Sequence, residues 1–285
     1  MNKKVLLLGS TGKMGLALSE VFSDGYLCEG KNSKDFDASD FIQVRHLIES
    51  SKPDIVINTV TLLGIDLCEE EAQKAFRLNT LYPKLLAELS KEHNFLLIHF
   101  STDAVFNDNK KDYYVESDAP CPLHVYGVTK YGGDCFVQAI AKHYYIARVS
   151  MLFGAATKPN QFVEKMLHLI HEGKDTLRIA DDIWGSPSYS VDIAHKIREL
   201  VEEQYAYGVY HIVNEGKVSL YELMCEVVEN LGLDVRIEKA SYRDFPSISR
   251  KNKNTPLKSE KIKMLRPWRQ AIKEYCRSIS NEILS

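Results

Sequence analysis

Residues 1–15, MNKKVLLLGSTGKMG, decide the fold of this 285-residue chain. Val5–Leu8 is a short apolar run, which predicts a buried strand. Gly9–Gly15 follows with the spacing G-x-x-G-x-x-G, and an amphipathic helical pattern begins at Leu16. Strand, glycine turn and helix together favour a pyrophosphate site, because a backbone without Cβ atoms approaches the ligand closely and the helix offers unpaired N–H groups. A purely structural turn would carry the same glycines, so the rest of the chain must decide.

Composition and charge narrow the class of protein. The chain is 45% hydrophobic and 26% charged, which is typical of a globular protein. Its net charge of −3 gives no overall basic bias toward nucleic acid, and no run approaches the eighteen or so apolar residues of a membrane span. Lys3 and Lys4 precede only four apolar residues, too few for a signal peptide. The six cysteines are scattered without a C-x-x-C pair, which predicts reduced thiols in a cytoplasmic protein and no metal site.

Apolar strand patterns alternate with helical patterns as far as Val149. The expected strands after the first are Tyr26–Glu29, Ile55–Ile57, Phe95–Phe100 and Ile146–Val149, and the expected helices are Phe41–Ser50, Cys68–Ser90 and Val125–Lys142. This alternation predicts an α/β fold with a Rossmann-type, doubly wound parallel sheet.

The pattern changes beyond Gly154, which predicts two domains. Residues 1–154 form the expected nucleotide-binding domain, to which Val191–Val213 returns. Residues 155–285 form the expected substrate lobe, a smaller α/β unit over the carboxyl edge of the sheet. Its expected elements include the helices Phe162–His171, Ser219–Leu231 and Trp268–Ser280, the strand Leu177–Ala180 and the turn-rich loop Asp181–Ser190.

Tyr126 and Lys130 lie four residues apart at the start of a predicted helix, so their side chains share one face, about 6 Å apart. A nearby ammonium favours a phenolate, which would lower the pKa of Tyr126 and make it a usable acid or base. Thr102, at the end of the preceding strand, can offer its hydroxyl to the same oxygen. A lone Y-x-x-x-K arises often by chance, but with the glycine turn it predicts hydride transfer to a carbonyl.

The end of the second strand bears on the choice of cofactor. Glu29 could accept a hydrogen bond from the ribose of NAD(H), whereas Lys31 and Lys34 could hold the 2′-phosphate of NADP(H). The lysines favour NADP(H), with NAD(H) left open. Ordinary loop charges would also explain all three residues.

The chain resembles an extended short-chain dehydrogenase/reductase, and within that superfamily the dTDP-4-dehydrorhamnose reductase family. The matching segments run in the family's order over nearly the whole chain: GSTGKMG (Gly9–Gly15), FDASD (Phe36–Asp40), NTVT (Asn58–Thr61), STDAVF (Ser101–Phe106), PLHVYGVTK (Pro122–Lys130), ARVSMLFG (Ala147–Gly154), WGSPSY (Trp184–Tyr189) and RPW (Arg266–Trp268).

The resemblance implies the residues of the site. Its catalytic residues would be Thr102, Tyr126 and Lys130. The cofactor would lie along Gly9, Thr11, Gly12, Lys13, Met14, Gly15, Lys31, Asp37, Ala38, Asn58, Thr59, Val60, Asn79, Tyr126 and Lys130. The substrate, a nucleotide sugar, would contact Thr61, Asp103, Ala104, Val105, Met151, Trp184 and Ser188. A capped core amide is an equal explanation of Asn79, and the oligomeric state stays open, a homodimer included.

Several residues depart from the family pattern. Ala104 and Met151 replace aromatic side chains, and Val60 replaces a small one. The predicted activity is reduction of the 4-keto group of a nucleotide-linked 4-keto-6-deoxy sugar by NAD(P)H. The altered pocket keeps a second hypothesis open: a non-catalytic relative like the regulatory subunit of methionine adenosyltransferase. A third is a sugar-nucleotide epimerase; a dehydratase is disfavoured because Thr102-Asp103 lacks the glutamate of Thr-Asp-Glu.

Overall fold

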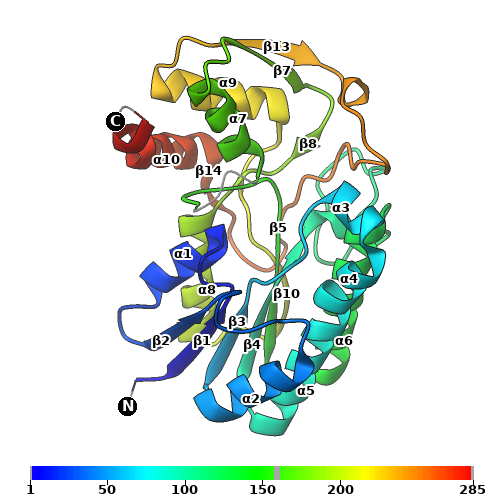
Figure 1. Cartoon of the computed structure of the whole chain (residues 1–285), viewed down its shortest axis with the longest axis vertical. Helices are drawn as coiled ribbons and strands as arrows, with labels where there is room; N and C mark the ends of the chain where they lie inside the picture. Colours follow the sequence, from blue (N-terminus) through cyan, green and yellow to red (C-terminus); the bar gives the residue numbers. More distant parts are fainter. Residues whose placement is uncertain (1, 157–160, 284–285) are drawn as a thin grey trace.

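The computed structural model describes residues 2–156 and 161–283. A parallel sheet with helices on both faces fills the lower half of Figure 1, and a smaller lobe covers the carboxyl ends of its strands. Met1 of the opening stretch and residues 157–160 of the expected second lobe lie outside the described residues. No helix among the described residues is long and apolar enough to cross a membrane.

The predicted doubly wound sheet is confirmed. Its six strands are all parallel, in the order β10-β5-β4-β3-β1-β2. They span Lys4–Leu8 (β1), Leu27–Lys31 (β2), Ile55–Asn58 (β3), Leu96–Thr102 (β4), Tyr144–Val149 (β5) and Gly208–His211 (β10). The chain runs outward from β1 to β2 and then returns to β3. The carboxyl ends of β1 and β3 therefore border the crevice where open α/β sheets bind ligands.

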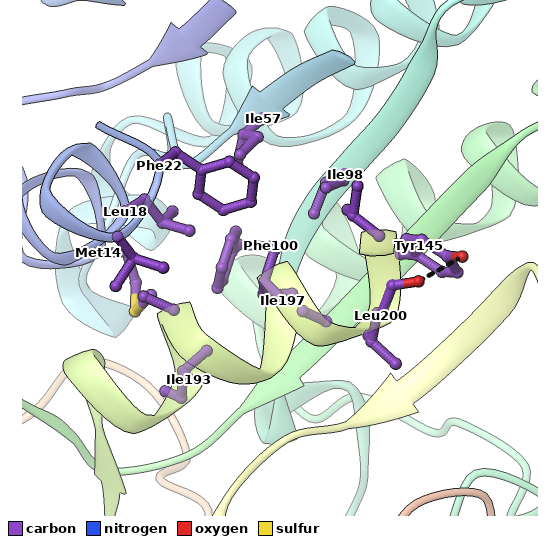
Figure 2. Packing of buried hydrophobic residues seen from close by; sticks show 14 of the residues in the cluster. Met14, Leu18, Phe22, Ile57, Ile98, Phe100, Tyr145, Ile193, Ile197 and Leu200 are labelled. Carbon is purple, nitrogen blue, oxygen red and sulfur yellow. Dashed lines mark hydrogen bonds between the residues drawn. The ribbon is translucent and has the colours of Figure 1, made fainter. Parts of the chain in front are cut away.

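Helices α1 (Lys13–Val21) and α8 (Ser190–Glu202) cover one face of this sheet. Figure 2 shows Leu18 of α1 and Phe22, the residue after α1, meeting the side chains of the central strands, with Ile197 of α8 packed against the same layer. The other face is covered by α2 (Phe41–Ser51), α5 (Tyr82–His93) and α6 (Val125–Ile140). Two apolar cores thus pack against the strands, one on each face of the sheet.

The smaller lobe has its own apolar core. It contains α7 (Phe162–His171), α9 (Leu220–Leu231), α10 (Trp268–Ile283) and the parallel pair β7 (Thr176–Ala180) and β13 (Arg236–Ala240). Helix α9 begins with a capping box, in which Ser219 and Glu222 each accept from the other's backbone N–H. Short strand pairs join the lobe to the sheet domain: β6 (Leu152–Phe153) with β9 (Ser188–Tyr189), β8 (Trp184–Gly185) with β12 (Val218–Ser219), and β11 (Asn214–Glu215) with β14 (Leu265–Pro267).

The segment Cys68–Ser90 is helical, as expected, but it is not a single regular helix. The segment forms α3 (Ile65–Glu70), α4 (Ala72–Phe76), a π-helical turn η1 (Arg77–Leu81) and then α5. The backbone breaks at Glu71, and the extra residue of the π turn lets Asn79 and Thr80 both face the interior. A 3.6-residue pattern cannot anticipate this, because the pattern assumes one uninterrupted helix.

The second strand is also longer than expected. It runs to Lys31, which pairs with Leu8, instead of ending at Glu29. Lys31 is therefore the last residue of β2, and Asn32 is the first residue beyond the strand.

Candidate active site

A cleft of about 860 Å³ lies between the carboxyl edge of the sheet and the smaller lobe. Fifteen of the residues expected in the site line it: Gly9, Thr11, Gly12, Lys13, Met14, Asp37, Ala38, Thr59, Val60, Thr61, Thr102, Asp103, Tyr126, Lys130 and Met151. Eight others do not: Gly15, Lys31, Asn58, Asn79, Ala104, Val105, Trp184 and Ser188. The described residues bring together no group of three or more His, Cys, Asp or Glu side chains that could hold a metal ion.

The glycine turn forms one wall of the cleft. Gly9 has φ of +91°, a conformation that side chains rarely adopt. A Cβ on Gly15 would overlap the Gly9 carbonyl and lie 2.6 Å from the carbonyl carbon of Ser10, so only glycine fits there. Helix α1 begins after Gly12 without a side-chain cap, which leaves the N–H groups of its first turn for an anion. The turn therefore has the shape and polarity of a pyrophosphate site.

Lys13 points away from this anion site. Its Nζ donates to the Leu152 carbonyl at 3.0 Å and pairs with Glu164 of α7 at 2.8 Å. The side chains of the pair are 1% and 11% exposed. An ion pair between buried partners thus ties the glycine turn to the smaller lobe across one end of the cleft.

The three expected catalytic residues meet at the middle of the cleft. Thr102 ends β4, and its hydroxyl is hydrogen-bonded to that of Tyr126 on α6. Lys130 lies one turn further along α6, is 3% exposed, and donates from Nζ to the Phe100 carbonyl at 2.6 Å. His124 caps this helix by accepting from the backbone N–H of Gly127, which fixes the turn that carries Tyr126.

The expected lowering of the Tyr126 pKa is wrong. Burial raises the pKa of the Tyr126 hydroxyl above its usual range, and the Thr102 hydroxyl beside it offsets only part of that effect. Burial also lowers the pKa of Lys130 to about 8, with the charge of Asp134 opposing the shift. Two residues four apart on a helix are close, but desolvation is the largest effect on the Tyr126 hydroxyl, and the charges of Asp103, Cys68 and Asp134 raise its pKa further. Tyr126 is therefore a protonated hydroxyl at neutral pH, suited to donate a proton.

The end of the cleft near β2 differs from the expectation in detail. Lys31 Nζ pairs with Glu29 at 3.1 Å, and the same carboxylate pairs with Lys4. The residues that line the cleft here are Asn32 and Ser33. Asp37 lines it as well, with Oδ1 accepting from the backbone and the hydroxyl of Ser39, which lowers the pKa of this carboxyl. This end of the cleft is thus formed by the polar side chains of Asn32 and Ser33, the apolar side chains of Phe36 and Ala38, and the Asp37 carboxylate.

Two buried amides support the loops of the cleft from behind. Asn58 accepts from the Val60 N–H, and Asn79 accepts from the Leu62 N–H and from the Thr61 hydroxyl. Both amides are fully buried. They hold the segment after β3 in place without reaching the cleft themselves.

Asp103 lies at the end of the cleft nearest the smaller lobe. Its carboxylate accepts from the hydroxyls of Thr102 at 3.1 Å, Ser150 at 2.8 Å and Thr255 at 2.6 Å. Burial raises the pKa of this carboxyl, and these hydrogen bonds oppose the shift. Met151 lines the cleft beside Ser150 with φ of +39°, a strained value for a side chain with a Cβ.

The remaining expected substrate residues lie behind this surface. Ala104 and Val105 are buried in a short 3₁₀ turn, η2 (Asp103–Val105). Trp184 belongs to β8, with Lys217 over its ring, and Ser188 donates from its buried hydroxyl to the Ser186 carbonyl. They shape the wall that carries Asp103 and Met151.

Sequence reasoning missed several residues of the site. Ser150 could have been found, because it follows a buried strand at the carboxyl edge of the sheet. Asn32 and Ser33 were missed because the second strand was ended two residues too early. Thr255 and Glu164 carry no local signal, since their partners lie more than a hundred residues away in the chain.

The chain is similar to known proteins over nearly its full length. The family model described as RmlD substrate binding domain matches residues 3–281. The spore coat polysaccharide biosynthesis protein SpsK of Bacillus subtilis (strain 168) is 31% identical, covering 98% of each chain. A dTDP-4-dehydrorhamnose reductase of Aggregatibacter actinomycetemcomitans is 31% identical over 95% of this chain and 97% of its own length. A solved structure of dTDP-4-dehydrorhamnose reductase from Bacillus anthracis strain Ames in complex with NADP superposes with a TM-score of 0.92 at 25% identity, covering 98% of this chain and 100% of the other.

Proposed function

Since the chain belongs to the RmlD substrate binding domain family, we propose that it reduces the 4-keto group of a nucleotide-linked 4-keto-6-deoxy sugar with NADPH. The chain is an oxidoreductase of this family. One observation carries the proposal: the protonated Tyr126 hydroxyl lies in the same cleft as the glycine turn, hydrogen-bonded to Thr102. This arrangement suits the reduction of a carbonyl in front of a dinucleotide.

The residues present fit a dinucleotide. The cradle that a Cβ on Gly15 would fill, together with the uncapped first turn of α1, suits the pyrophosphate. Asn32, Ser33 and Asp37 would lie along the adenosine. The bound cofactor supplies a hydride to the carbonyl carbon. A relative at 25% identity is described in complex with NADP, which supports the phosphorylated cofactor for this chain.

Side chains of the protein itself supply the proton for the reduction. Tyr126 donates its hydroxyl proton to the oxygen that becomes the new alcohol, because its raised pKa keeps the proton in place until that oxygen becomes basic. Thr102 orients the Tyr126 hydroxyl. Lys130, held by the Phe100 carbonyl, provides a positive charge on the same helix face, which stabilises the phenolate that forms.

The polar end of the cleft suits a hydroxylated ring. Asp103, Ser150 and Thr102 present hydrogen-bonding groups there, while Met151 offers an apolar surface for the 6-deoxy methyl group. We also propose a cytoplasmic location, supported by six cysteines that are all free thiols.

The test is NADPH consumption by the purified chain against dTDP-4-dehydrorhamnose and other nucleotide-linked 4-keto sugars, with cofactor binding titrated in parallel. Oxidation of NADPH with one of these sugars, absent in Tyr126→Phe, is the expected result. Tight NADPH binding without turnover on any of them would refute the reductase and favour the non-catalytic, partner-binding hypothesis.

A further inference from the structure

Four polar side chains that do not line the cleft form a buried cluster behind Lys130. They are Asn58 of β3, His99 of β4, Asp134 of α6 and Arg148 of β5, with exposed fractions of 0%, 1%, 0% and 3%. We refer to these four residues as the buried network. Burying charged groups is costly unless they are paired, so their arrangement calls for a physical reason.

The hydrogen bonds of the buried network determine which of its atoms carry protons. Asn58 accepts from the Val60 N–H through Oδ1, so its Nδ2 donates to His99 Nδ1 at 3.1 Å. The single proton of the neutral imidazole is then on Nε2, which faces Asp134 Oδ1 at 3.9 Å. Arg148 Nε donates to the other oxygen, Asp134 Oδ2, at 3.1 Å. Burial and the charge of Lys130 hold the pKa of His99 well below its usual range, so this ring stays neutral.

Lys130 lies four residues before Asp134 on α6, on the same face of the helix. Its ammonium donates to the carbonyl of Phe100, the neighbour of His99 in β4. Asp134 is the charged group that favours the protonated form of Lys130, against the effect of burial. Without Asp134, two cations, Lys130 and Arg148, would share one buried region with no counter-ion.

The net charge of Lys130, Arg148, Asp134 and Tyr126 is consistent with loss of a proton from Tyr126. Before proton transfer, Lys130 and Arg148 contribute two positive charges and Asp134 one negative charge. When Tyr126 loses its proton, the four groups together become neutral. Asp103, beside Thr102, and Cys68 of α3 also act on Tyr126, and like Asp134 they raise the pKa of its hydroxyl.

We propose that Asp134 is a positioning residue for the reduction: held by Arg148 within the buried network, its carboxylate is the counter-charge of the buried Lys130 ammonium on the same face of α6. This inference deepens the proposed function and rests on it for its catalytic consequence. The electrostatic part concerns Lys130 alone and can be measured without any reaction.

The decisive experiment follows the Lys130 ammonium by NMR. The full chain is labelled with ¹³Cε-lysine, its Lys130 signal is assigned by its absence in Lys130→Met, and the signal is titrated with pH. In Asp134→Asn the Lys130 titration should move to lower pH by about one unit, because the nearest negative charge is gone. Glu88→Gln is the matched control, since Glu88 pairs with Lys84 at the same i,i+4 spacing but in solvent. It should leave the Lys130 signal unchanged.

Asp134→Asn leaves Arg148 without its partner and could destabilise the fold. The double variant Asp134→Asn/Arg148→Gln removes both charges and leaves neutral polar side chains. Lys130 should still titrate at lower pH than in the wild-type chain, because Asp134 and not Arg148 is the charge that acts on it. An unchanged Lys130 titration in the folded variants would overturn the proposal.

Activity provides the second readout. The alkaline limb of kcat should move to lower pH in Asp134→Asn, with KM for the sugar changed less than twofold or so, because the substrate contacts remain. A shifted NMR titration in a chain whose wild type reduces no sugar would refute the proposed function and leave the inference on Lys130 supported. A shifted titration with an unchanged pH profile of kcat would refute the catalytic role of the network.

Discussion

The substitution Glu164→Gln tests whether the ion pair between the glycine turn and the smaller lobe holds the two parts together. Glu164 on α7 pairs with Lys13 at 2.8 Å, and the side chains are 11% and 1% exposed. The glutamine keeps the volume and one acceptor oxygen but removes the negative charge. Lys13 then remains buried without a counter-ion.

The expected loss in the free energy of unfolding follows from the burial of this ion pair. Removing one partner of a buried ion pair costs about 3–5 kcal/mol, because an uncompensated charge is left behind. Glutamine still offers a carbonyl oxygen to Lys13, so we expect a loss near the lower end, about 3 kcal/mol in the free energy of unfolding. Lys13→Met combined with Glu164→Gln should recover most of this loss, since no charge is then buried.

The dependence on pH gives a second signature. Burial already lowers the pKa of Lys13, and Glu164 acts in the opposite direction. The variant loses the opposing charge, so folded Lys13 releases its proton at a lower pH than the unfolded chain does. Between those two values the unfolded state binds more protons, and stability therefore rises with pH. The deficit of Glu164→Gln should accordingly shrink as the pH is raised above neutral.

Urea unfolding at neutral and alkaline pH, followed by circular dichroism and tryptophan fluorescence, measures both effects. Glu172→Gln is the matched control, because Glu172 caps the same helix and pairs with His168 with both side chains about half exposed. Its expected change is below about 0.5 kcal/mol. A loss of less than about 1 kcal/mol in Glu164→Gln, or a deficit that grows with pH, would refute the reasoning.

The remaining predictions concern the cleft. Tyr126→Phe should lower kcat by about 10²–10⁴-fold and change the Kd for NADPH less than about twofold. Steady-state kinetics and a fluorescence titration would measure the two effects, and retained turnover would exclude Tyr126 as the acid. Gly15→Ala should abolish NADPH binding or unfold the turn, because the new Cβ overlaps the Gly9 carbonyl; wild-type binding by titration would contradict this. Ser33→Asp should raise the Kd for NADPH about tenfold or more and leave that for NADH nearly unchanged, and equal effects on both would show that Ser33 is not near the 2′-phosphate. kcat/KM should fall as the pH rises through about 8, where Lys130 loses its proton, and a flat profile across that range would argue against a charged Lys130 in the reaction.

Local spacing in the sequence is sufficient to predict several parts of this protein. The apolar run Val5–Leu8 and the glycines after it predicted the first strand, turn and helix, because burial and backbone conformation act within a few residues. The alternation of strands and helices predicted the parallel sheet for the same reason. The spacing of Tyr126 and Lys130 placed both on one helix face, where the structure has them.

Local errors came from backbone events that a regular period does not encode. The π turn that buries Asn79 interrupted the expected helix. The extension of β2 to Lys31 moved the cleft wall to Asn32 and Ser33.

The electrostatics of the site depend on contacts between segments that are far apart in the sequence. The pKa of Tyr126 rises instead of falling, since burial among distant segments of the chain disfavours the phenolate. Asp103 meets the hydroxyl of Thr255 across 152 positions of sequence, and Lys13 meets Glu164 from the other lobe. The pKa of an ionisable group depends on its solvent exposure and on its nearest charged and hydrogen-bonding partners. Both are set by packing between distant segments, which a local sequence pattern does not encode.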